Sequence, residues 1–458
     1  MKNDFSKGSV IKNILNLAFP MTMAQLINVL YNIVDRIYIG KIPENATLSL
    51  TGLGLAFPII TIITAFANLI GMGGTPLFSI ERGNQNEKEA EYILGNSFCI
   101  LLIFSVILTT NTYLFRRPLL FLFGASSATY PFADAYLKIY LIGTVFVLIG
   151  LGMNSFINAQ GFGRMGMFTV VIGAIANIIL DPIFIFAFGM GIKGAALATV
   201  ISQALSAIWI IKFLVGKKTI LRLKVKCLQL NVDRIKKILS LGLSGFIMSI
   251  TNGAVQIMCN ATLQTYGGDL YIGVMTVINS IREVISMPVM GITNSAQPVI
   301  GYNYGAKEYG RVKTAIQFMS SVCIAYTLIA WGILNIFPNF FIEIFNKDTD
   351  LVNAAIPALK IYYFGFFMMA FQFSGQSTFV ALGKAKQAVF FSLLRKAVIV
   401  IPLTIWLPHI SNLGTNGVFL AEPISNFIGG LACFITMLIT VIPELRKKGN
   451  ERSAIDCN

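Results

Sequence analysis

The chain has 458 residues, of which 55% are hydrophobic and only 12% are charged. No soluble domain of this length needs so much apolar surface, and apolar runs of about 20 residues recur along the chain. The net charge of +15 comes from Lys and Arg gathered between these runs, which is typical of the cytoplasmic face of a membrane protein rather than of a nucleic-acid binder. We therefore expect an all-α polytopic membrane protein, embedded in a lipid bilayer and without a nucleic-acid partner.

The hydrophobic runs predict twelve transmembrane helices. They cover residues 12–40, 49–80, 92–115, 132–158, 164–187, 192–214, 234–265, 270–300, 312–336, 352–380, 385–408 and 415–441. Several exceed the usual spanning length of about 20 residues, so we expect them to tilt or to extend beyond the bilayer.

Lys and Arg residues are unevenly distributed between the connections. If both termini are cytoplasmic, the inner segments hold 23 of them and the outer loops five. This asymmetry predicts cytoplasmic termini and a multi-pass location in the cell membrane. The basic start of the chain leads into a long helix without a small-residue cleavage site, so no removable signal peptide is expected.

The two halves of the chain repeat each other. The motif LKIY at 137–140 recurs at 359–362, and Pro182 aligns with Pro402. Six helices per half is an even number, so both repeats should share one orientation in the membrane. The predicted parts are an N-lobe at 1–214, a basic cytoplasmic linker at 215–233, a C-lobe at 234–441 and a cytoplasmic tail at 442–458.

The first helix carries a polar stripe that ends in an acid. Gln25, Asn28, Asn32 and Asp35 are spaced three, four and three residues apart, which places them on one helical face. A carboxylate in the hydrocarbon zone costs roughly 2.5–3.5 kcal/mol even on the lenient insertion scale, so this face should line the bundle interior or a water-filled cavity. The alternative is that Asp35 only pairs with its neighbour Arg36.

A second acid lies in the fifth helix. Asn177 and Asp181 are one helical turn apart in an otherwise apolar run, and Pro182 follows. A glycine-rich turn then reverses the chain and returns Thr199 to a similar depth. Oxygen ligands of these types suit a hard monovalent cation, and the same carboxylates could instead carry protons. A purely structural polar contact between helices is the alternative.

The second half does not repeat the two acids. The position matching Asp35 is Cys259 or Asn260, and Ile401 matches Asp181. Glu422 aligns with Thr199 and has two interpretations, a role in coupling or cationic substrate binding, or an ion pair with Arg395 or Lys396.

At this point the chain resembles the multidrug and toxic compound extrusion (MATE) family, in its bacterial MepA-like or DinF-like branch. The motifs that carry the resemblance are VDRIYIG at 34–40, NIILDPIFIF at 177–186 and GITNSAQPVIGYNYGAKEYGRV at 291–312. The resemblance covers nearly the whole chain. It implies a twelve-helix antiporter of two pseudo-symmetric six-helix lobes, which exports organic, mostly cationic and amphipathic compounds or drugs in exchange for Na⁺ or H⁺ entry.

The resemblance also implies roles for residues. The family's cation site corresponds to Asp35, Asn177, Asp181 and Thr199, and its substrate pocket includes positions that match Tyr31, Tyr136 and Asn154. Further polar side chains within the predicted membrane helices complete this pocket. Its predicted residues are Gln25, Asn28, Tyr31, Asn32, Tyr136, Asn154, Gln203, Gln256, Glu283 and Glu422. Family branches with acids on helices 7 and 10 use them as cation ligands, and these helices lack them here, so no C-lobe cation site is predicted. We expect a monomer without a cofactor other than its coupling ion, and Na⁺ and H⁺ both fit.

Three other classes of protein fit the sequence less well. A flippase for lipid-linked precursors, or a polysaccharide exporter, has related architecture, and the small number of central cations (Arg282, Arg395 and Lys396) argues against it. A major-facilitator porter would carry a basic motif between helices 2 and 3, where this chain has ERGNQNEKEAE. An enzyme is not expected, because no His, Cys or Ser constellation forms a nucleophile or a metal site.

Overall fold

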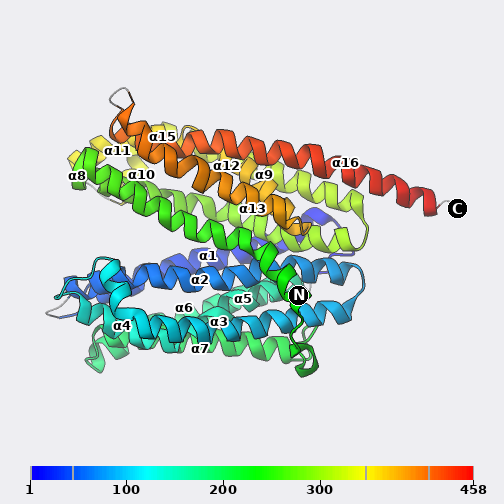
Figure 1. Ribbon diagram of the computed structural model, residues 1–458, viewed down its shortest axis with the longest axis horizontal. Helices are drawn as coiled ribbons and strands as arrows, with labels where there is room; N and C mark the ends of the chain where they lie inside the picture. Colours follow the sequence, from blue (N-terminus) through cyan, green and yellow to red (C-terminus); the bar gives the residue numbers. More distant parts are fainter. Residues whose placement is uncertain (1–2, 44–45, 346–347, 411–412, 457–458) are drawn as a thin grey trace. The chain divides into compact units, whose positions relative to one another are not determined.

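The computed structural model describes residues 3–43, 46–345, 348–410 and 413–456, and these are almost entirely helical (Figure 1). The elements, in chain order, are α1 (Val10–Ile39), α2 (Ala46–Gly83), α3 (Glu87–Leu122), α4 (Tyr130–Ile142), α5 (Thr144–Ala159), α6 (Gly163–Pro182), η1 (Ile183–Ala187), α7 (Ile192–Val215), η2 (Val225–Leu228), α8 (Val232–Gly305), α9 (Tyr309–Ile336), α10 (Pro338–Glu343), α11 (Thr349–Tyr363), α12 (Met368–Ala381), α13 (Ala385–Leu393), η3 (Leu394–Val400), α14 (Ile401–Trp406), η4 (Leu407–His409), α15 (Thr415–Ser425), η5 (Asn426–Gly430) and α16 (Leu431–Asp456). Residues 1–2, 44–45, 346–347, 411–412 and 457–458 lie outside the described residues.

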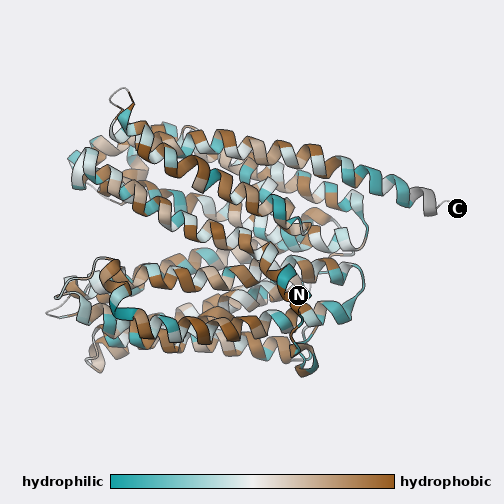
Figure 2. Cartoon of the chain, in the orientation of Figure 1, coloured by the Kyte–Doolittle hydropathy of each residue, from teal (hydrophilic) through white to brown (hydrophobic). Residues whose placement is uncertain are grey.

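The described part of the chain holds the twelve expected spans. Nine helical segments are individually long and apolar enough to cross a bilayer, and two bent pairs, α4 with α5 and α11 with α12, add two more. One of the nine segments, α8, contains two helices joined at Gly268, where φ is 66°. Apolar colours run along the middles of the helices, whereas the α2–α3 connection and the far end of α16 are polar (Figure 2). An all-α membrane protein with twelve spans is therefore confirmed.

The chain forms two compact units. The first unit contains Phe19–Phe246, and the second contains Phe5–Ala18 together with the chain from Ile247 onward. The boundary thus falls inside α8 and not in the linker at 215–233, where the sequence placed it. The start of α1 joins the second unit because Arg311 donates to the carbonyl oxygens of Phe5 and Gly8, at 2.9 Å each.

Close backbone contact holds α2 against the beginning of α8 in the first unit. A Cβ added to Gly242 would lie 1.7 Å from the carbonyl oxygen of Leu69, and one added to Gly73 would lie 2.0 Å from that of Ile238. Only glycine fits at such an approach, since every other residue brings a Cβ. The two helices therefore pack backbone to backbone at this point.

Polar contacts bind the linker to the α2–α3 connection in the same unit. Asn86 caps α3 by accepting from the backbone N–H of Glu89 at 3.3 Å, and the Glu89 carboxylate accepts from Arg234 at 2.7 Å. Glu91 accepts from Lys224 at 2.7 Å, and this hydrogen bond raises the pKa of Lys224 above its usual value. These charged pairs sit where the sequence predicts the cytoplasmic face.

The repeat seen in the sequence is also visible in the helix breaks of each unit. The chain bends by 57° between α4 and α5, at Gly143, and by 48° between α11 and α12, across residues 364–367. The π-helical turns do not match in this way, because η1 follows Pro182 whereas η3 ends before Pro402. In the glycine-rich turn before α7, Gly189 and Gly191 have φ of 63° and 56°, the left-handed region that favours glycine.

Candidate cation and substrate sites

The two predicted acids of the first unit are buried and in contact. Asp35 on α1 is 8% exposed and Asp181 at the end of α6 is fully buried. Their carboxylates lie within hydrogen-bonding reach of each other. Two unit charges 4 Å apart repel by roughly 4 kcal/mol at an effective dielectric constant of about 20, so this pair favours a cation or a proton between its oxygens.

Several oxygens at this point have room for a further ligand. The amide of Asn177 donates to one oxygen of Asp181 at 3.2 Å, which fixes the carboxylate against its own helix. Asp35 Oδ1, Asp181 Oδ2 and Asn177 Oδ1 are buried, and no hydrogen-bond partner for them exists within the described chain. Buried acceptors without partners are costly, and carboxylate and amide oxygens are the ligands that hard cations prefer. The residues present therefore fit a proton or Na⁺.

No fixed positive charge neutralises these acids. Within the described ranges, neither Asp35 nor Asp181 forms an ion pair with Lys or Arg. The guanidinium of Arg36 instead lies over the ring of Phe57, 5.8 Å from its centroid. The alternative in which Asp35 only pairs with Arg36 is therefore not what the structure shows. The pair is therefore open to neutralisation by a proton or a mobile cation.

Thr199 and two tyrosines lie beside the acids. Tyr136 on α4 is buried and lies close to Thr199 on α7. The ring of Tyr136 stacks on that of Tyr140, with centroids 6.0 Å apart. Tyr31 lies one helical turn before Asp35 and close to both acids. The four residues predicted for the cation site thus occupy one region of the first unit, with aromatic hydroxyls around them.

A small cavity adjoins this cluster. Its volume is about 50 Å³, and Asn28, Tyr31, Asn177, Thr199 and Gln203 are among the residues that line it. That volume holds a few water molecules or one hydrated ion, because a single water needs about 10–15 Å³ on the same measure. The cavity gives an ion a polar compartment next to the two acids.

Three further predicted pocket residues lie outside this cavity. Gln25 is half-buried, and Asn32 is exposed and donates to the carbonyl of Asn28 on its own helix at 2.7 Å. Asn154 donates to the carbonyl of Gly166 at 3.3 Å. Their role in substrate binding stays a prediction.

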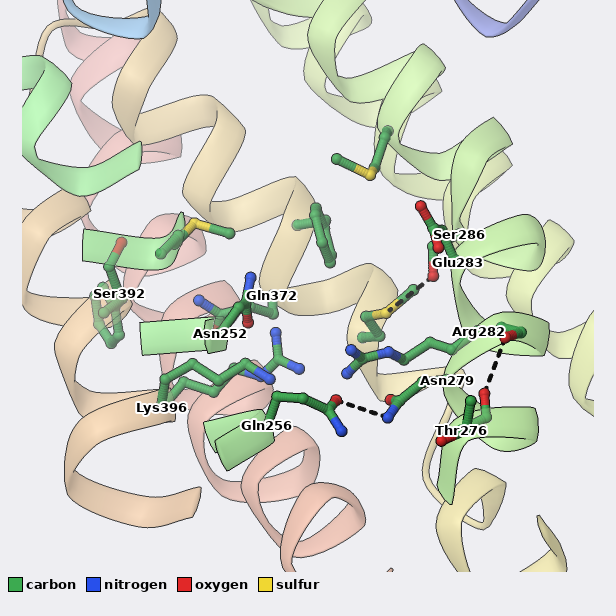
Figure 3. Close-up of a pocket in the computed structure, with 17 residues that line it drawn as sticks. Asn252, Gln256, Thr276, Asn279, Arg282, Glu283, Ser286, Gln372, Ser392 and Lys396 are labelled. Carbon is green, nitrogen blue, oxygen red and sulfur yellow. Dashed lines mark hydrogen bonds between the residues drawn. The ribbon is translucent and has the colours of Figure 1, made fainter. Parts of the chain in front are cut away.

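The predicted residues of the second half surround a different cavity. Gln256 and Glu283 line a space of about 500 Å³ in the second unit (Figure 3). Glu422 is buried and forms ion pairs with Arg395 at 2.5 Å and with Lys396 at 3.0 Å, which is the second of its two interpretations from the sequence. The predicted residues therefore do not form one pocket: Asn28, Tyr31 and Gln203 line the cavity of the first unit, and Gln256 and Glu283 line the cavity of the second.

Sequence reasoning missed part of the small cavity. Thr169, Ser202 and Ser206 also line it, and Ser206 donates to the carbonyl of Thr169 at 2.9 Å. The spacing from Thr199 through Gln203 to Ser206, four and three residues, was the available signal. Serine and threonine are common in membrane helices, so only the packing of α6 against α7 shows which of them line the cavity.

The comparisons with known proteins decide the family. The family model described as MatE matches residues 20–183 and 245–406, which is most of the chain. The chain belongs to the MatE family. The resemblance noted in the sequence is thereby confirmed, and the protein is a transporter, not an enzyme.

Named relatives agree with this assignment. The chain is 25% identical over 396 residues to the multidrug export protein MepA of Staphylococcus saprophyticus, covering 86% of this chain and 87% of the relative. It is 26% identical over 402 residues to MepA of Staphylococcus haemolyticus, with the same coverage. An outward-facing multidrug resistance MATE family transporter of the MOP superfamily matches with a TM-score of 0.89 at 22% identity, covering 97% of this chain and 99% of that one. This MatE protein thus shares its whole fold with solved transporters.

Proposed function

We propose that this MatE protein is a secondary active multidrug efflux antiporter, which exports organic, mostly cationic and amphipathic compounds in exchange for Na⁺ or H⁺ entry. The observation that carries the proposal is the contact between Asp35 and Asp181, two buried acids without a fixed counter-charge in the described structure. The staphylococcal relatives named as multidrug export proteins support the class of cargo.

The coupling mechanism follows from where the acids sit. Asp35 is on α1 and Asp181 is on α6, so repulsion between their charges disfavours close contact of the two helices, and a proton or Na⁺ between the carboxylates removes this repulsion. α1 can then approach α6 and change the environment of Asn28 and Tyr31, which precede Asp35 on the same helix. A cation that binds one arrangement a few kcal/mol better than the other shifts the populations enough for exchange.

The division of α1 between the units gives this movement a place to occur. Its first residues belong to the second unit up to Ala18, and its later residues belong to the first unit. Pro20 lies just after this division and lacks the N–H for the hydrogen bond of an ordinary helical turn. We propose that α1 bends or shifts near Pro20 when Asp35 is neutralised. The substrate pocket then loses its affinity for the cargo, which leaves to the outside.

The test is efflux of a fluorescent organic cation from proteoliposomes, with Na⁺ and pH gradients imposed separately. At least one inward cation gradient should accelerate efflux over vesicles without a gradient, and the effective one identifies the ion. Equal efflux with and without both gradients would contradict antiport. We also propose that both termini are cytoplasmic and that the protein is a monomer. Protease access to the termini tests the orientation, and the mass of the purified protein tests the oligomeric state.

A flippase or exporter for lipid-linked precursors is the second candidate, and one observation favours it. Arg282, Arg395 and Lys396, the few central cations of the sequence, all contact one carboxylate in the second unit. Movement of a fluorescent lipid between leaflets, independent of both ion gradients, would identify this function instead.

A further inference from the structure

The second unit contains a cavity that the cation-coupling cluster does not use. It has a volume of about 500 Å³, which lies in the range of small-molecule sites. α8, α12, α13 and η3 supply its lining. Figure 3 shows Arg282 and Lys396 extending into the same space from different helices, with the hydrogen-bonded pair Gln256 and Asn279 between them.

Positive charge exceeds negative charge around this cavity. Glu422 is contacted by Arg395 at 2.5 Å, by Lys396 at 3.0 Å and by Arg282 at 3.7 Å. Three cations therefore share one carboxylate. Glu283 also lines the cavity, but it is exposed and forms no ion pair in the described ranges, so a net positive charge remains even when both carboxylates are counted.

The excess charge lies on groups that are nearly out of contact with water. Arg395 is 5% exposed and Lys396 is 6% exposed. Burying a charge without full compensation is costly, and a balanced structural ion pair would need only one cation for Glu422. The packing of the helices therefore does not by itself explain why three cations surround one carboxylate.

Unused hydrogen-bonding capacity points the same way. The Nε–H of Arg395 is a buried donor without a partner in the described structure, and its side chain lines the cavity. A guanidinium carries five N–H donors in a planar fork that matches the two oxygens of a carboxylate or phosphate. An anionic oxygen in the cavity would accept a hydrogen bond from the Nε–H of Arg395 and would neutralise part of the excess positive charge.

The rest of the lining combines polar side chains, among them Asn252, Thr276 and Gln372, with adaptable apolar ones. Met248, Met290, Met369, Phe373 and Phe391 face the same space. Methionine and aromatic side chains accept hydrocarbon of varied shape, because thioethers are flexible and polarisable. The cavity therefore offers cations together with adaptable apolar side chains, which suits an anionic amphiphile.

We propose that this second-unit cavity binds the anionic group of an amphiphile, a carboxylate or a phosphate, through Arg395, Lys396 and Arg282. Glu422 holds the three cations together and competes with the ligand for them. The site goes beyond the proposed cation antiport and does not depend on it. It would let the protein take zwitterionic or anionic molecules, or hold a lipid headgroup, in a part of the molecule separate from Asp35 and Asp181.

The experiment measures binding without any ion gradient. Full-length protein in phosphatidylcholine nanodiscs is titrated with 1-pyrenebutyrate and, as a matched cation, with (1-pyrenemethyl)trimethylammonium, and fluorescence anisotropy gives the affinities. Wild type should bind the carboxylate, and Arg395→Gln should weaken this binding while leaving the affinity for the ammonium compound unchanged. No measurable carboxylate binding in wild type, or an equal loss for both probes in Arg395→Gln, would overturn the proposal while leaving the antiport proposal untouched.

Two variants with opposite expected effects separate a binding role from a structural one. Arg395→Gln should weaken 1-pyrenebutyrate binding about tenfold or more, because a hydrogen bond to a charged group is lost. Glu422→Gln should strengthen it, because the cations lose their internal competitor. Lys360→Gln is the control, since Lys360 is exposed on α11 and outside the lining. Equal losses in both cavity variants, or an unchanged affinity in Arg395→Gln, would show that the cluster only supports the fold.

Competition identifies the source of the anion. Replacing part of the phosphatidylcholine by phosphatidylglycerol should weaken probe binding if a lipid phosphate occupies the site. Inorganic phosphate at tens of millimolar should compete if a free anion does. If neither competes, the carboxylate amphiphile itself is the ligand class, and all three results support an anion site provided that Arg395→Gln reduces binding.

Discussion

The carboxylates of Asp35 and Asp181 are the residues on which cation coupling should depend. Asp35→Asn and Asp181→Asn each remove one charge and keep the shape of the side chain. Gradient-driven efflux of a fluorescent cation should fall to background in both variants, while the amount of protein in the membrane stays near that of wild type. Proteoliposome efflux with equal protein loading is the measurement, and near-normal driven efflux in both variants would remove the coupling role.

A third acid of the same unit provides the matched control. Asp134 is buried on α4 like the two coupling acids, but it is paired with Arg116 at 2.8 Å and with Lys138 at 2.6 Å. Asp134→Asn should therefore keep cation-driven efflux and lower the melting temperature, because two cations lose their partner. Loss of coupling in this variant would mean that any buried acid of the unit matters equally.

Asn177 should tune the cation site without being essential to it. Its amide donates to Asp181 at 3.2 Å and its own oxygen has no partner in the described structure. Asn177→Ala removes a hydrogen bond to a charged group, worth about 1.5–3 kcal/mol. The concentration of the driving ion that gives half-maximal efflux should therefore shift by roughly ten- to a hundredfold. An unchanged half-maximal concentration would exclude Asn177 from the site.

At the scale of the elements, the contact between α2 and α8 should be intolerant of any added atom. Gly242→Ala places a methyl group where 1.7 Å separates it from the carbonyl oxygen of Leu69. Overpacking of this kind costs about 1–3 kcal/mol, so the melting temperature in detergent should fall. Gly253 lies on the same helix with open space around it, and Gly253→Ala should leave the melting temperature unchanged or higher. Equal effects of the two changes would argue against the close approach.

Pro20 should matter for the movement of α1 and not for its folding. Pro20→Ala restores a helical N–H, and the stiffer helix should transport more slowly, roughly tenfold, while the driving ion still raises the melting temperature. Pro443→Ala makes the same change within α16, far along the chain, and should leave the rate unaltered. A normal rate in Pro20→Ala would place the hinge elsewhere.

At the scale of the whole molecule, hydrophobic runs predicted all twelve spans, but not where helices break or continue. The bend at Gly143, the π-helical turns η1 and η3 and the short α10 all lie inside or beside runs that read as uniformly apolar. Polarity reports the solvent around a helix and not its hydrogen-bond register. The last helix was predicted to end at residue 441, but it continues to Asp456. Charged residues can continue a helix outside the bilayer, so the end of an apolar run does not mark the end of the helix.

The candidate site could be predicted where its residue types are rare in membrane helices, and not where they are common. Acids inside apolar runs stand out, so Asp35 and Asp181 were found from spacing and burial cost alone. The gathering of Arg282, Arg395 and Lys396 around Glu422 was not, because the residues come from different helices and only packing brings them together. In the sequence, the small number of these cations argued against a flippase. In the structure, all three lie around the same carboxylate.

The most direct test of the account is ion movement coupled to cargo. Proteoliposomes are loaded with ethidium and given no imposed ion gradient, and internal pH and Na⁺ are followed with dyes while ethidium leaves. The account predicts that H⁺ or Na⁺ moves against the cargo in wild type and that this movement disappears in Asp35→Asn and Asp181→Asn. Ethidium efflux without any ion movement in wild type, or undiminished ion movement in both variants, would contradict it.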